Sequence, residues 1–100
     1  MNKATLNLKN KFEELKKKYL EKKNDEVIQE CNNILEKNKI DVFYNLLCLA
    51  HNNKGNFIEA INVMKIALKQ NPKNVDFFNN IGLSYANIFK YEKAEEFYNK

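Results

Sequence analysis

The chain has 100 residues, of which 44% are apolar and 30% are charged, and its formal net charge is +4. This length and balance are typical of one folded globular domain and exclude a largely disordered chain. No stretch approaches the roughly 18 consecutive apolar residues of a membrane span, and the lysine-interrupted start lacks the apolar segment of a signal peptide. We therefore expect a cytoplasmic protein.

All seventeen basic residues are lysine, and eighteen asparagines accompany them. An AT-rich coding sequence produces both excesses, so the two counts alone say little about function. The positive charge is concentrated at one end, because residues 1–23 hold eight Lys against three Glu and the remainder holds nine Lys against ten acidic residues. The two cysteines are too few for a disulfide framework or a zinc knuckle, and we expect both to be reduced.

Residues 5–22 form the first predicted helix, because Leu8, Phe12, Leu15 and Tyr19 recur at the spacing of one helical face. A basic face remains outside this stripe and consists of Lys9, Lys16, Lys17, Lys18, Lys22 and Lys23. Such a face can dock on nucleic acid or an anionic membrane. Without arginine or a recognisable nucleic-acid-reading motif, we consider both partners unlikely and favour a solvated helix surface. A second helix is predicted at 24–38, with Val27, Cys31 and Ile34 on its inner face.

A repeat of 34 residues organises the rest of the chain. It places bulky residues opposite bulky ones and small opposite small, aligning Tyr44, Leu47, Cys48, His51, Ala60 and Met64 with Phe78, Ile81, Gly82, Tyr85, Ala94 and Tyr98. Each unit predicts two amphipathic helices, at 41–54 and 57–70 and again at 75–88 and 91–100. The small residues at 48, 60, 82 and 94 would let paired helices approach closely.

Local signals mark the ends of these helices. Gly55 is expected to supply a left-handed stop, and Asn56 with Glu59 resembles a capping box. Pro72 is expected to end the following helix, and Asn74 is placed to cap the next one.

The pattern resembles the tetratricopeptide repeat, in which an aromatic residue, Leu, Gly and Tyr are followed by Ala, an aromatic residue and Pro at fixed spacing. Residues 41–74 form one full repeat, 75–100 form a second that stops within its second helix, and 8–40 form a degenerate first repeat with one residue of slippage. His51 replaces the usual tyrosine, and Phe89 takes the place of Gly55. The resemblance implies an all-α fold, an α-solenoid of antiparallel helix pairs with about three repeats in a right-handed superhelix, forming a single domain over residues 1–100.

The chain offers little for catalysis. It has one His and one Ser, so a nucleophile would require His51 together with Ser84, Cys31 or Cys48. The histidine and both cysteines fall on predicted core positions, where a thiol is unreactive. The two glycines cannot form a phosphate-binding glycine motif. We expect no enzymatic activity, no cofactor and no metal site.

The resemblance implies instead a noncatalytic protein-interaction module, an adaptor or scaffold, whose first helices line a concave groove for an extended peptide or a partner protein. The candidate groove residues are Asn45, Leu49, Asn52, Asn53, Asn79, Asn80, Leu83 and Asn87. An asparagine side chain both donates and accepts, so a row of them can bind a peptide backbone, and the leucines would add apolar contact. With so many asparagines in the chain, a merely solvated face is the alternative.

A further alternative is structural self-assembly. The last predicted repeat stops within its second helix, which leaves Phe97 and Tyr98 uncovered. We expect either a fragment of a longer protein or an end that docks onto another copy.

Overall fold

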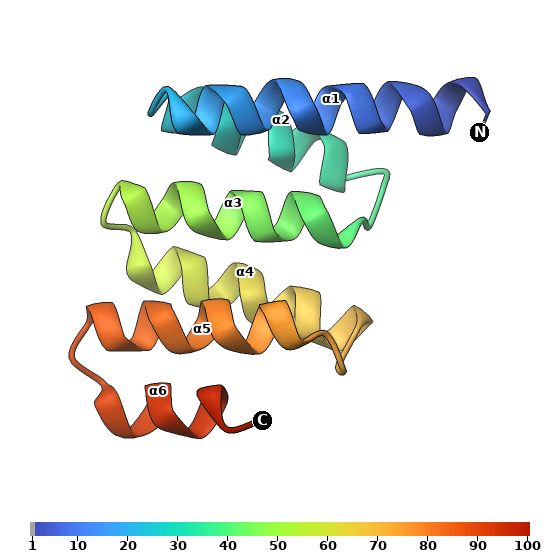
Figure 1. Ribbon diagram of the computed structural model, residues 1–100. Coiled ribbons are helices and arrows are strands. Elements are labelled where there is room, and N and C mark those ends of the chain that lie inside the picture. Colours follow the sequence, from blue (N-terminus) through green and yellow to red (C-terminus); the bar gives the residue numbers. More distant parts are fainter. Residues whose placement is uncertain (1) are drawn as a thin grey trace.

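The computed structural model describes residues 2–100, which form a stack of six helices (Figure 1). In chain order these are α1 (Lys3–Leu20), α2 (Asn24–Leu35), α3 (Asp41–Asn53), α4 (Phe57–Gln70), α5 (Val75–Asn87) and α6 (Tyr91–Tyr98). Each helix packs against the next one along the chain. The predicted all-α fold of sequential helix pairs is confirmed, and it is consistent with about three pairs of the tetratricopeptide type.

The same turn joins the two helices of every pair. Its left-handed residue is Lys22 in the first pair, Gly55 in the second and Phe89 in the third, with φ of 63°, 79° and 64°. In each turn the following backbone N–H donates to the carbonyl five residues earlier: Lys23 to Lys18, Asn56 to His51 and Lys90 to Tyr85, at 2.9, 2.8 and 2.9 Å. This is the Schellman ending of a helix, so the predicted stop at Gly55 is confirmed. Lys22 precedes Gly55 by 33 residues and Gly55 precedes Phe89 by 34, in agreement with the slippage in the first repeat.

The helix bounds follow from these turns and from the caps. Helix α4 has its predicted bounds, whereas α1, α2, α3, α5 and α6 end one to three residues earlier than predicted. Asn74 caps α5 as predicted, because its side-chain oxygen accepts from the backbone N–H groups of Asp76 and Phe77 at 2.9 and 3.3 Å. The capping box at Asn56 is wrong, since its side chain makes no cap hydrogen bond. At ψ of 63°, Asn56 lacks the extended backbone of a capping residue.

Aromatic side chains connect successive pairs through the core. Phe43 and Phe77 are among the largest fully buried side chains. Phe43 meets Phe12 of α1 edge to face with ring centroids 5.9 Å apart, and Phe77 meets Tyr44 of α3 in the same way at 6.5 Å. Such pairs add to the apolar burial that holds helices together. Phe43 and Phe77, which lie near the starts of α3 and α5, are therefore packing residues.

Gly82 marks the closest approach of α5 to α6. A Cβ atom at this position would lie 2.7 Å from Cε1 of Tyr98, far inside normal contact distance. Gly82 and Ala94 are buried, as are Cys48 and Ala60 in the second pair. The prediction that small residues allow paired helices to approach closely is confirmed at this contact.

Among residues 2–100, no helix combines the length and the apolar character that crossing a membrane requires.

Candidate functional site

The odd-numbered helices form the inner side of the stack. Within the described chain, α3 contacts both α1 and α5, whereas α4 contacts neither α2 nor α6. Figure 1 shows α1, α3 and α5 one beneath another and running in the same direction. A stack whose odd-numbered helices meet while the even-numbered ones separate curves toward the odd-numbered side. We call the outward surface of α1, α3 and α5 the concave face.

Aliphatic side chains lie exposed along this face. Leu83 on α5 is 41% exposed, and Leu49 occupies the equivalent place on α3 and is half-buried. Two further residues lie nearby that the sequence did not indicate: Val42, which is 41% exposed, and Leu20, which is 70% exposed. Val42 stands three and seven residues before Asn45 and Leu49, at helical spacing. The repeat does not indicate Val42, because it places Asp76, a charged residue, at the equivalent position.

The six predicted asparagines fall into three sets. Three of them form a half-buried polar seam between α3 and α5: the Asn80 side chain donates to Oδ1 of Asn45 at 2.8 Å, and Ser84 Oγ donates to Oδ1 of Asn52 at 3.0 Å. Asn53 donates instead to Asn24 at the start of α2, at 3.4 Å. The remaining two, Asn79 and Asn87, are exposed. Some amide groups of the predicted ladder thus already hold helices together.

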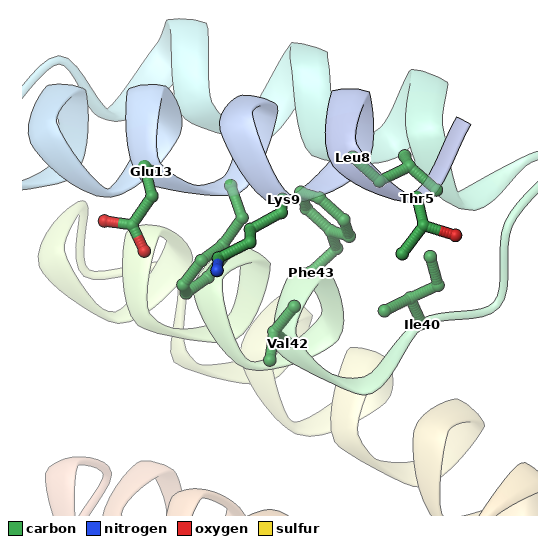
Figure 2. Close-up of a pocket in the computed structure, with 8 residues that line it drawn as sticks. Thr5, Leu8, Lys9, Glu13, Ile40, Val42 and Phe43 are labelled. Carbon is green, nitrogen blue, oxygen red and sulfur yellow. The ribbon is translucent and has the colours of Figure 1, made fainter. Parts of the chain in front are cut away.

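A furrow runs between α1 and α3 on the concave face. It consists of two hollows of about 470 and 210 Å³ that share Phe12 and Val42 as lining residues. Leu8 and Lys9 line the first hollow, and Lys16, Leu20 and Leu49 line the second. Figure 2 shows the first hollow, with Thr5 and Ile40 at one end, Glu13 at the other and Lys9 reaching from α1 toward α3. We call the two hollows together the α1–α3 furrow.

The lysines of the predicted basic face do not share one surface. Lys18 turns toward α2, where its Nζ lies 3.0 Å from a Glu30 oxygen, and the other Glu30 oxygen lies 2.6 Å from Nζ of Lys11. These hydrogen bonds, from Lys11 first and then from Lys18, outweigh burial and lower the pKa of Glu30 below its ordinary value. Lys23 lies 3.7 Å from Glu21. Lys9 and Lys16 line the α1–α3 furrow, while Lys17 and Lys22 are exposed.

The groups considered for catalysis have packing roles. Burial raises the pKa of the Cys31 thiol to about 12 and that of Cys48 to about 11, so both remain protonated and unreactive at neutral pH. Burial also lowers the pKa of His51, whose buried Nδ1 has no hydrogen-bond partner among residues 2–100. Ser84 is fully buried in the polar seam. In the part of the chain that the structure describes, no three His, Cys, Asp or Glu side chains gather into a metal site.

Comparison with known families identifies one segment. Residues 75–100, which contain α5 and α6, match the tetratricopeptide repeat. Neither the curated proteins nor the solved structures give a match to this chain. The match confirms the resemblance over the third helix pair, and this repeat indicates a protein-interaction module of a typically noncatalytic kind.

Proposed function

We propose that the chain is a noncatalytic interaction module that binds an extended segment of a partner protein on its concave face. The observation that carries the proposal is the row of exposed or half-exposed aliphatic side chains on the odd-numbered helices: Val42, Leu49 and Leu83. Exposed apolar groups aligned on one face of a folded protein are typical of interaction sites. The tetratricopeptide match at residues 75–100 supports protein partners in general.

The proposal treats residues 1–100 as one domain of three units, at 8–40, 41–74 and 75–100. The shared turn at Lys22, Gly55 and Phe89 supports this division, because it recurs at nearly constant spacing. A stack of this kind buries a continuous core only when successive pairs pack together.

Asparagine has two roles in this proposal. Asn45, Asn52 and Asn80 set the spacing of α3 and α5 through the polar seam. Asn79 and Asn87 are exposed and would offer donors and acceptors to the backbone of a bound segment. Seam residues also retain unused amide capacity, since each side chain has two N–H donors and two acceptor sites.

The decisive experiment compares two double variants of the whole chain. Val42→Arg with Leu83→Arg places charge on the concave face, where both residues are 41% exposed. The control, Ile58→Arg with Ile66→Arg, makes the same chemical change on α4, where the residues are 58% and 51% exposed. Circular dichroism and thermal melting establish that both variants fold.

Capture from a lysate of the source cells then reports binding. We expect specific partner proteins on the wild type and on the α4 control, with their loss from the concave-face variant, because a buried unpaired arginine opposes apolar contact. Equal capture by the two variants would show that the concave face is not the binding surface.

A second candidate, self-association, is favoured by exposed aromatic side chains at the last pair. Phe89 and Tyr91 pack edge to face with centroids 6.2 Å apart, yet both are exposed, as is Tyr98. Sedimentation of the wild type and of Phe89→Ser with Tyr91→Ser at high concentration tests this candidate. A wild-type protein that sediments as a monomer at every concentration would exclude self-association.

A further inference from the structure

Helix α1 carries two pairs of lysines with the same spacing and different surroundings. Lys11 and Lys18 stand seven residues apart and both contact Glu30 of α2. Lys9 and Lys16 also stand seven residues apart but line the α1–α3 furrow, and neither has an acidic oxygen within 4.0 Å among residues 2–100. One side of the helix therefore pairs its positive charge within the fold, and the furrow side leaves its charge unpaired.

The furrow between these two lysines is largely apolar. Phe12 and Val42 line both of its hollows, and Leu8 lines the first beside Lys9. Figure 2 shows the Lys9 side chain crossing from α1 toward α3 in the first hollow. An apolar channel with a cation at each hollow fits a ligand that is apolar in the middle and negatively charged on its flanks.

We propose that the α1–α3 furrow binds a partner segment in which acidic residues flank an apolar side chain, an inference that rests on the proposed function and names the chemistry of its ligand. Seven residues of α-helix span about 10.5 Å. An extended chain advances about 3.3 Å per residue, so its acidic residues would stand about three apart. An aliphatic or aromatic side chain between them would rest against Phe12 and Val42.

One carboxylate opposes this preference and sharpens its test. Glu13 lines the first hollow and lies between Lys9 and Lys16 in sequence. The furrow thus presents two cations and one anion to a ligand, and removing the anion should strengthen binding of an acidic segment. A purely apolar groove would not respond to Glu13→Gln in this direction.

Peptide display on the full chain provides an unbiased probe. Random ten-residue peptides are selected on the immobilised wild-type protein, and one selected peptide is then synthesised with a fluorophore for affinity measurement. We expect enrichment of Asp and Glu around an apolar residue. Analogues of the synthetic peptide with Gln in place of its acidic residues should bind more weakly, and added salt should weaken the parent peptide.

Charge-matched variants locate the contact. Lys9→Gln with Lys16→Gln should weaken binding about tenfold, since two charge-assisted contacts are lost, and Glu13→Gln should strengthen it. The control Lys65→Gln with Lys69→Gln removes the same charge from α4, where both lysines are exposed, and should leave the affinity unchanged. If both double lysine variants weakened peptide binding equally, the effect would depend only on net charge, and the proposal would be overturned.

The remaining outcomes separate this inference from the proposed function. Selected peptides without acidic residues, whose binding is nevertheless lost in Val42→Arg with Leu83→Arg, would overturn the acidic preference and leave the concave face as a binding surface. Selection of no peptide would overturn the inference. The partner-capture experiment would still decide the proposed function independently.

Discussion

The two junctions between neighbouring odd-numbered helices are built in different ways. Between α3 and α5, side-chain hydrogen bonds join Asn45 to Asn80 and Asn52 to Ser84. Between α1 and α3, apolar side chains such as Phe12 and Val42 line an open furrow. The first junction joins its helices through polar side chains, whereas the second exposes apolar side chains that the proposed partner would cover. The hydrogen-bonded seam and the proposed binding furrow thus lie at different places on one face.

The largest expected loss of stability lies away from the furrow, at the contact of α5 with α6. Gly82→Leu should lower the free energy of unfolding by about 1–3 kcal/mol, because the added side chain overfills the space beside Tyr98. Urea unfolding measures the change. The matched test combines Gly82→Leu with Tyr98→Ala, which removes the ring. The free energy of unfolding of the double variant should fall by less than the sum of the two single losses. An unchanged midpoint in Gly82→Leu would contradict the close contact.

Ser84→Ala tests the polar seam itself. Ser84 is fully buried and donates to Asn52 at 3.0 Å, so the variant leaves a poorly hydrated acceptor and should lower the free energy of unfolding by about 1–2 kcal/mol. Adding Asn52→Ala removes that acceptor. The free energy of unfolding should then fall by less than it does when Asn52→Ala is made in the wild type. If the two changes prove strictly additive, the seam is not a coupled network.

Glu30→Gln tests how much the ion pairs between α1 and α2 contribute to stability. The variant should lower the free energy of unfolding at neutral pH by no more than about 1 kcal/mol, because the ion pairs with Lys11 and Lys18 are partly solvated. Thermal melting at low salt measures this loss. Glu26→Gln is the control, since Glu26 is more exposed and lies 3.7 Å from Lys18.

The same variant predicts a pH dependence with a definite sign. Hydrogen bonds from Lys11 and Lys18 lower the pKa of Glu30 in the fold below its ordinary value of 4.5. The stabilisation is therefore present above pH 4.5 and is lost as the pH falls through the lowered pKa. Wild type and Glu30→Gln should differ at neutral pH and converge in acid. A difference that persists at low pH would show that packing, not charge, holds α1 to α2.

The sequence predicted the helices well because their signals are local and repeated. Apolar spacing placed every helix, and Gly55 indicated the turn of the second pair. No glycine marks the turn at Lys22, and the first helix was predicted to extend through this residue, whereas α1 ends at Leu20. The errors are local too: Asn56 has the residue type of a cap, but its backbone conformation is set by the preceding turn.

The candidate site was harder to predict, because its composition depends on which side chains face each other across helices. The repeat indicated Asn45 and Asn80 as groove residues, yet their mutual hydrogen bond depends on the distance between α3 and α5. Likewise, the helical pattern placed Lys9 and Lys18 together on the basic face, and only the position of Glu30 on α2 shows that Lys18 is paired within the fold. Pairing across elements is information that a helical stripe does not contain.

Substitution of Val42 should have the smallest effect on stability. It should also distinguish the two junctions most clearly. Because Val42 is 41% exposed, Val42→Ser should change the free energy of unfolding by less than about 0.5 kcal/mol. The same variant should lower the affinity for a captured partner, since it removes apolar contact from both hollows of the furrow. Ser84→Ala should show the opposite pattern, with reduced stability and retained binding. A large stability loss in Val42→Ser would mean that the furrow is closed in solution, and the contrast between the two junctions would fail.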